Sequence, residues 1–84
     1  MKQLMVISEE NHGTIGVATN FQKAKEYLLE SGWIGEHSDV YDDKNEGWCP
    51  VTEMFGENWQ EGILAQDENF FDGMFYFEWI DFMD

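Results

Sequence analysis

The stretch KQLMVISEENHGTIGVA, residues 2–18, decides the expected fold because it holds two apolar runs separated by a turn. Residues 2–8 are predicted to form a β-strand whose apolar side chains point alternately to both faces. Residues 9–13 are rich in turn-forming types, including asparagine and glycine, which accept positive φ angles. Residues 14–18 contain three β-branched residues, which favour a second strand. The stretch therefore predicts a β-hairpin.

A helix is expected directly after this hairpin, over residues 20–31. Thr19 and Gln22 fit a capping box, in which each side chain satisfies a free backbone amide of the first turn. Apolar residues then recur at helical spacing: Phe21, Ala24 and Leu28, with Tyr27 beside them. Gly32 favours the left-handed conformation that ends many helices.

Residues 35–50 are compatible with two structures. Gly35, Gly47 and Pro50 interrupt any regular pattern. The segment DVYDDKNEGWC, residues 39–49, forms either a second hairpin that turns near residues 43–45 or an acidic loop.

A second helix is predicted over residues 53–64, capped by Thr52. Apolar residues recur every four positions: Val51, Phe55, Trp59 and Ile63. Three glutamates also recur every four positions, offset by two: Glu53, Glu57 and Glu61. Two positions correspond to about 200° of helix rotation, so the acids face solvent, and we expect Phe55 and Trp59 to be buried. Gly56 and Gly62 each weaken this helix by up to about 1 kcal/mol relative to alanine, so packing must hold it.

The C-terminal segment MFYFEWID, residues 74–81, is predicted to form a strand with Phe75, Phe77 and Trp79 on one face. Seven aromatic residues fall within residues 70–82, more than one strand face can bury. We therefore expect Tyr76 at the surface as a partner contact. The expected fold is an α+β single domain, residues 1–84, with two helices and a small antiparallel sheet made of the N-terminal hairpin and the C-terminal strand.

The charge of the chain is concentrated in its second part. The net charge is −14, and the sequence contains no arginine. Residues 1–29 sum to zero, whereas residues 30–84 carry fifteen acids against one base, Lys44. Such an excess costs stability through self-repulsion, so we expect it to serve either solubility or a basic partner. The candidate partner-binding residues are Glu53, Glu57, Glu61, Asp39, Asp42, Asp43, Glu46 and Tyr76.

The helical glutamates support one specific idea about that partner. They would be spaced about 6 Å apart along a helix, close to the density at which a DNA duplex presents its phosphates. The stripe could therefore occupy a DNA-binding groove of a basic protein. Direct binding of nucleic acids or anionic membranes is not expected from so acidic a chain.

The sequence gives little support for catalysis, metals or cofactors. The acidic segment lacks the alternating carboxylates and central glycine of a calcium loop, and GTIG, residues 13–16, lacks the lysine of a phosphate loop. A nucleophilic pair of Cys49 and His37 is conceivable but has no recognisable sequence context. We expect no enzyme activity, no metal and no cofactor.

The sequence also bears on location. Cys49 is the only cysteine, which excludes an intramolecular disulfide and suits a reducing compartment. We expect no signal peptide and no membrane span, and therefore a cytoplasmic protein.

Three segments resemble small, largely uncharacterised proteins encoded by phages and prophages of Gram-positive bacteria: ENHGTIGVA (10–18), KAKEYLLESGWI (23–34) and FFDGMFYFEWIDF (70–82). The resemblance implies a short phage protein made in the cytoplasm of a bacterial host. Small acidic phage proteins often inhibit host defence or host DNA enzymes, sometimes by imitating DNA. We therefore expect an inhibitor of a basic, DNA-binding host protein, such as a CRISPR effector or a restriction enzyme. The alternative is an accessory or structural phage protein whose acids only solubilise it, and a homodimer is compatible with either.

Overall fold

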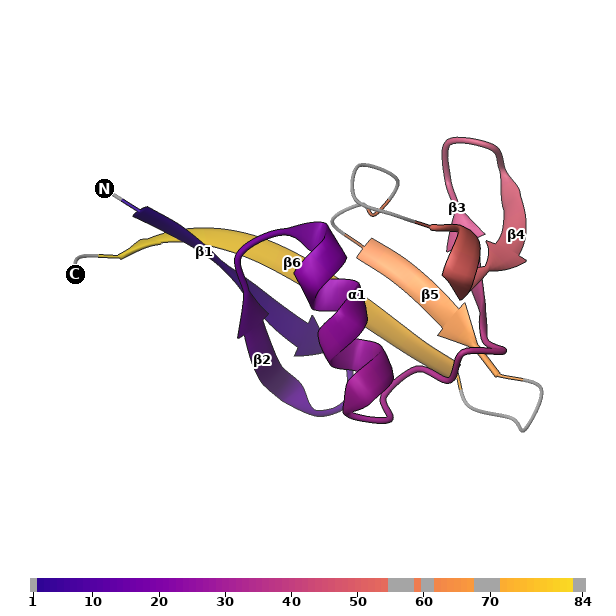
Figure 1. Ribbon diagram of the computed structural model, residues 1–84, viewed down its shortest axis with the longest axis horizontal. Helices are drawn as coiled ribbons and strands as arrows, with labels where there is room; N and C mark the ends of the chain where they lie inside the picture. Colours follow the sequence, from indigo (N-terminus) through magenta and orange to yellow (C-terminus); the bar gives the residue numbers. More distant parts are fainter. Residues whose placement is uncertain (1, 55–58, 60–61, 68–71, 83–84) are drawn as a thin grey trace.

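The computed structural model describes residues 2–54, 59, 62–67 and 72–82, and their main feature is a six-stranded antiparallel sheet. The strand order is β2-β1-β6-β5-β3-β4 (Figure 1). The strands are β1 (Lys2–Glu9), β2 (Gly13–Ala18), β3 (Asp39–Asp42), β4 (Gly47–Pro50), β5 (Gly62–Gln66) and β6 (Asp72–Phe82). One α-helix, α1 (Phe21–Glu30), and a short 3-10 helix, η1 (Val51–Glu53), complete the described elements.

The predicted α+β fold with two helices is wrong, because the described chain is mainly β. The helix expected over residues 53–64 is replaced by η1 at its start and β5 at its end, while residues 55–58, 60 and 61 lie outside the described residues. Gly56 and Gly62 disfavour a helix here. The short apolar run Ile63–Ala65 instead gains two strand partners, β6 and β3. Tertiary pairing therefore overrides a helical spacing that was real in the sequence.

Helix α1 lies where it was expected, but its N-cap differs from the prediction. The Asn20 side chain accepts a hydrogen bond from the Lys23 backbone amide at 2.8 Å, so the cap is one residue later than Thr19. At the other end Gly32 has a φ of 78°. The Trp33 amide donates to the Leu28 carbonyl at 3.0 Å and the Gly32 amide to the Leu29 carbonyl at 3.3 Å. These two bonds form a Schellman motif, as the sequence indicated.

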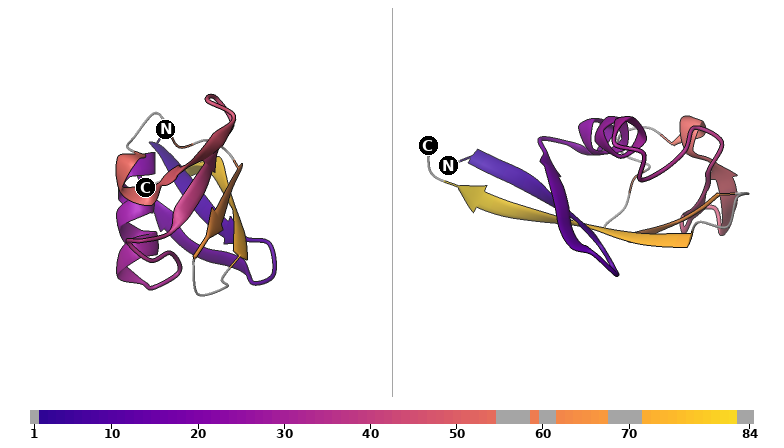
Figure 2. Two further views of the ribbon diagram at one scale, coloured as in Figure 1. Left: turned by 90° about the vertical axis from the view of Figure 1, so that its right-hand side faces the viewer. Right: turned by 90° about the horizontal axis from the view of Figure 1, so that it is seen from below.

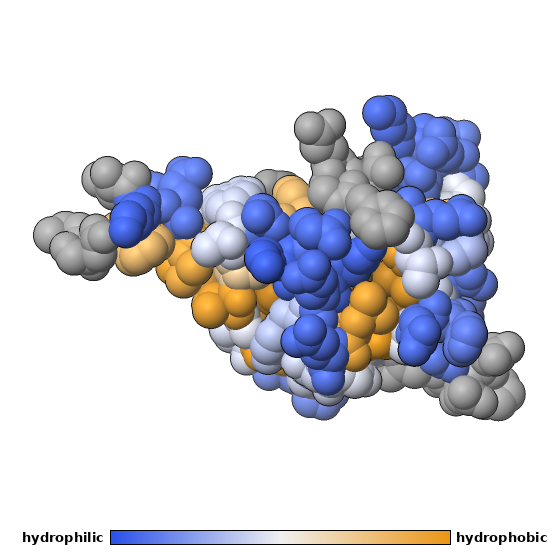
Figure 3. Space-filling model, viewed as in Figure 1, coloured by the Kyte–Doolittle hydropathy of each residue, from blue (hydrophilic) through white to orange (hydrophobic). Residues whose placement is uncertain are grey.

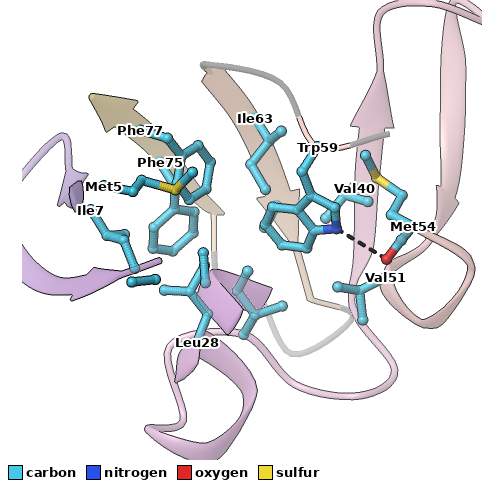
Figure 4. Packing of buried hydrophobic residues seen from close by; sticks show 14 residues of the cluster. Met5, Ile7, Leu28, Val40, Val51, Met54, Trp59, Ile63, Phe75 and Phe77 are labelled. Carbon is cyan, nitrogen blue, oxygen red and sulfur yellow. Dashed lines mark hydrogen bonds between the residues drawn. The ribbon is translucent and has the colours of Figure 1, made fainter. Parts of the chain in front are cut away.

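The hydrophobic core lies between α1 and one face of the sheet (Figure 2, right). It includes side chains from nearly every element: Met5, Ile7, Ala24, Leu28, Val40, Val51, Met54, Trp59, Ile63, Ala65, Phe75 and Phe77. Trp59 is buried, as predicted, and its ring packs edge-on against Phe77 at a centroid distance of 5.7 Å (Figure 4). Phe55, its expected companion, lies outside the described residues. The Trp59 prediction was right although the predicted helix was wrong.

A buried lysine joins α1 to the segment after η1. Lys25 is only 3% exposed, and its Nζ donates to the Met54 carbonyl oxygen at 2.7 Å. The indole Nε1 of Trp59 donates to the same oxygen at 3.0 Å. Desolvation lowers the pKa of Lys25, and the nearby Glu26 carboxylate opposes that shift.

Candidate interaction surface

The sheet has one face that α1 does not cover, which we call the open face. Strand register defines it, because paired residues point to the same side. Moving from β2 to β4, the pairs Val6–Val17, Leu4–Ile80, Ser8–Tyr76, Gly62–Tyr76 and Tyr41–Trp48 lie on this face. The neighbouring pairs Ile7–Phe77 and Val40–Ala65 point into the core instead.

Large apolar side chains are exposed on the open face. Val17 is 52% exposed, Trp48 47%, Tyr76 46% and Ile80 39%. The Trp48 ring packs edge-on against Tyr41 at a centroid distance of 5.7 Å, so it is held in place while remaining accessible. Exposed aromatics on a rigid sheet are typical of protein interaction surfaces.

Carboxylates accompany these apolar groups. Register places Asp39, Asp72 and Glu78 on the open face, together with one base, Lys2. All four are exposed. The face therefore combines apolar anchors with a negative charge.

The β3–β4 hairpin carries the densest group of described acids. It confirms one of the two structures considered for residues 35–50, a hairpin whose turn spans residues 43–46. The Asp42 side chain accepts hydrogen bonds from the Lys44 and Asn45 backbone amides at 3.0 and 3.3 Å and from Asn45 Nδ2 at 2.8 Å. Asp42 therefore shapes the turn, whereas Asp43 and Glu46 point into solvent. Figure 3 shows hydrophilic residues gathered over this hairpin.

The pKa of the Cys49 thiol reflects the burial and the negative charge around it. Burial raises the pKa of the Cys49 thiol, and the negative charges of Asp42, Glu53 and Asp39 raise it further. Asp39 and Asp42 lie on β3 and Glu53 lies in η1, so the fold brings acids from two elements within electrostatic reach of this thiol. A raised pKa disfavours the thiolate, which is the nucleophilic form of cysteine.

The structure brings most of the predicted site residues to one end of the sheet, though not in the predicted arrangement. Asp39, Asp42, Asp43, Glu46 and Glu53 surround the β3–β4 hairpin and η1. Tyr76 lies on the open face of β6. Glu57 and Glu61 lie outside the described residues, whereas Glu53 lies in the 3-10 helix η1 and not in the α-helix that was expected to carry all three glutamates.

Three exposed residues were missed by the sequence reasoning: Val17, Trp48 and Ile80. The alternation of side chains in a strand could have identified Trp48. If residues 39–50 are read as a hairpin, Tyr41 and Trp48 are equally distant from its turn and so pair on one face.

The remaining described acids are spread over the molecule. Glu10 lies in the β1–β2 turn, and Glu26 and Glu30 lie on α1. Lys23 pairs with Glu26 at 3.6 Å, where both side chains are well exposed. The described carboxylates therefore do not form a single continuous face.

The β1–β2 turn uses a buried acid structurally. Glu9 is 3% exposed, and its Oε2 accepts a hydrogen bond from the Asn11 amide at 3.0 Å and contacts Nδ1 of His12. The His12 ring lies edge-on to Trp33 at 5.1 Å. These contacts tie the turn to the end of α1.

A shallow depression of about 470 Å³ lies beside the C-terminal end of α1, between Leu29 and Ile34. Glu30 and Glu36 are the charged residues among its described lining. It therefore offers no cationic group to an anionic substrate. Across the described part of the chain no group of three or more histidine, cysteine or acidic side chains is placed to hold a metal ion.

Within the same ranges, no helix has both the length and the apolar character needed to cross a membrane. Comparison with known proteins gave no match to a family model, to a curated protein or to a solved structure.

Proposed function

We propose that this protein is a non-enzymatic inhibitor that binds a basic, DNA-binding protein of a bacterial host and covers its positively charged surface. One observation carries the proposal: the face of the sheet that α1 does not cover presents exposed aromatic and aliphatic side chains beside carboxylates. Trp48 and Tyr76 would supply anchors that lose water on binding. The acids would accelerate association and select a basic surface over others.

The β3–β4 hairpin would contribute charge at the edge of this contact. Asp43 and Glu46 are exposed at its turn, and Asp39 lies on the open face of the same hairpin. They are the described acids best placed to reach the phosphate-binding positions of a partner. This version of the proposal does not need a regular helical spacing of charges.

The proposal is tested by titrating the protein against purified DNA-binding nucleases, including restriction enzymes and CRISPR effectors, and measuring residual cleavage at several incubation times. An inhibitor that acts by binding should reach an endpoint set by its molar ratio to the target. Activity loss that keeps growing with time at far less than equimolar amounts would instead indicate an enzyme.

A matched pair of charge reversals tests the surface. The variant Asp43→Lys/Glu46→Lys should slow association strongly, whereas Glu30→Lys/Glu36→Lys changes the net charge equally on another part of the molecule. Equal slowing by both variants would mean that only total charge matters. Binding should also weaken steeply between low and high salt, because the Debye length falls from about 10 Å at 0.1 M to about 3 Å at 1 M.

A second function, an accessory or structural phage protein whose acids only keep it soluble, is favoured by one observation. Acids also lie on α1, which covers the other face of the sheet (Figure 2), and in the β1–β2 turn. Under this alternative neither charge reversal would affect any partner, and both would reduce solubility alike.

A further inference from the structure

On one side of its last part, β6 has no strand partner among the described residues. β6 pairs with β1 from Phe75 to Phe82, but β5 covers its other side only from Asp72 to Tyr76. No described strand lies on the β5 side of residues 77–82. The β1–β6 ribbon consequently projects beyond the rest of the sheet (Figure 1).

The hydrogen-bonding direction of the backbone identifies the groups on this edge. The Glu10 amide donates to the Met74 carbonyl oxygen at 3.0 Å, so the backbone of Met74 faces β1. In an antiparallel strand the backbone groups of successive residues point alternately to the two neighbours. Every second residue after Met74 therefore faces β1, and the N–H and C=O groups of Trp79 and Asp81 face the open edge.

We propose that the β6 edge at residues 77–82 receives an extended, cationic strand of the partner protein. Strand addition of this kind supplies main-chain hydrogen bonds for affinity and uses the alternating side chains for selectivity. The incoming strand would pair with the outward N–H and C=O groups of Trp79 and Asp81.

The negative charge at the β6 edge favours a basic segment of a partner as the added strand over a second copy of this chain. Glu78 and Asp81 are exposed on the ribbon, and neither forms an ion pair with any residue that the structure describes. A second copy would bring two more carboxylates to the adjacent strand and join two chains that each carry a net charge of −14. Edge acids thus oppose self-association and attract lysine or arginine.

Apolar groups flank the edge on both faces of the ribbon. Trp79 is 41% exposed on the α1 side, where its ring lies edge-on to Phe21 at 6.3 Å. Ile80 is 39% exposed on the open face. An incoming strand would find one apolar contact on each side, and the Trp79 ring can also stack with a cation.

The probe for a direct test is a short synthetic peptide in which lysine and valine alternate. Its matched control has the central valine replaced by proline, which keeps the charge but prevents strand pairing. Backbone hydrogen exchange, measured residue by residue in the full chain by NMR, should slow at Trp79 and Asp81 by at least about tenfold with the alternating peptide only. Glu78 and Ile80, whose amides face β1, serve as internal references.

Two variants separate backbone pairing from charge. Asp81→Pro removes an outward N–H that no described strand uses, so it should leave the melting temperature nearly unchanged while abolishing protection of Trp79. Asp81→Asn removes only the charge and should weaken binding of the peptide without abolishing that protection. Unchanged exchange at Trp79 and Asp81 while the peptide is bound elsewhere would overturn the proposal. Protection without peptide that grows with protein concentration would also overturn it, in favour of a second copy.

This inference rests on the proposed function in assuming a basic partner, but the two can fail separately. Inhibition of a nuclease without protection of the β6 edge would leave the proposed function standing and reject strand addition. Protection of the edge by the peptide without inhibition of any nuclease would reject the proposed function and leave strand addition standing.

Discussion

The ring of Tyr27 on α1 lies so close to Gly16 on β2 that a Cβ atom added at Gly16 would be 2.5 Å from Tyr27 Cε1. The Tyr27 hydroxyl also donates a hydrogen bond to the carbonyl oxygen of Ile15. The phenol ring therefore joins the helix to the edge strand β2 through both close packing and a hydrogen bond. The absence of a side chain at residue 16 makes this close approach possible.

Replacing Gly16 with alanine should destabilise the protein by about 1–3 kcal/mol, because the new methyl group requires the Tyr27 ring to move. The matched control is Gly47→Ala, whose Cβ would meet only a backbone atom at 3.9 Å. Urea unfolding monitored by tryptophan fluorescence measures both variants. Equal stability of Gly16→Ala and the unmodified protein would contradict the observed packing.

Glu46→Gly should stabilise the protein by about 1 kcal/mol. Glu46 has a φ of 51°, a left-handed conformation that costs a residue with a Cβ but suits glycine. Glu36→Gly removes the same charge from another exposed position that is not in this conformation, and it should not stabilise. The melting temperatures of the two variants should be compared at high salt, where the loss of one charge affects stability least. A gain of equal size in both variants would show that charge and not backbone strain is responsible.

Burial of Lys25 predicts a pH dependence with a definite sign. Its folded-state pKa is lowered from the ordinary value of 10.5 by desolvation, so the unfolded chain holds this proton more tightly. Below the folded-state pKa both states are protonated, and the cost of burying the charge is fully present. As pH rises through the folded-state pKa towards 10.5, the folded protein loses the proton first and this cost disappears.

The unmodified protein should therefore gain stability relative to Lys25→Met as pH rises through that window. The titrations of all other groups cancel in the difference between the two proteins. Chemical unfolding at a series of alkaline pH values provides the measurement. A stability difference that does not change with pH would mean that Lys25 titrates in the folded protein as it does in the unfolded chain.

Alkylation of Cys49 by iodoacetamide should be slow at pH 8, because burial and the surrounding acids raise the pKa of the thiol. Glu53→Gln should accelerate the reaction by roughly threefold, the effect expected from removing one charge several ångströms away through a water-like medium. Glu36→Gln changes the charge equally but is not one of the acids that raise this pKa, and should leave the rate unchanged. If both variants react at the rate of the unmodified protein, Glu53 does not act on the thiol.

Local sequence signals predicted the elements that depend mainly on neighbouring residues. The β1–β2 hairpin follows from alternation around Gly13, and the end of α1 follows from the glycine at residue 32. Strand β5 could not be found in this way. Ile63 and Ala65 are buried because β6 and β3 lie on either side of them, and both partners are distant in the sequence.

The candidate interaction surface likewise combines features that local sequence signals predict with features that depend on contacts between distant residues. The concentration of acids at residues 39–46 could be read directly from the sequence. Their proximity to Glu53 could not, because it depends on the chain returning through η1 beside Cys49. The stretch of β6 that no described strand covers on its β5 side could not be predicted, because it arises from the different lengths of β5 and β6. Trp79 was expected on the face shared with Phe75 and Phe77 and does lie there, yet it remains 41% exposed whereas the other two are buried.

The pairing of β1 with β6 has a consequence for how the protein forms in the cell. These two central strands are the first and last described elements, and Lys2 lies opposite Phe82. Among the described strands β6 is synthesised last, so until it emerges from the ribosome β1 can pair only with β2. Contacts of such long sequence separation fold slowly. Folding should therefore be a late, nearly all-or-none event, which leaves the apolar strands of the unfinished chain accessible to chaperones during synthesis.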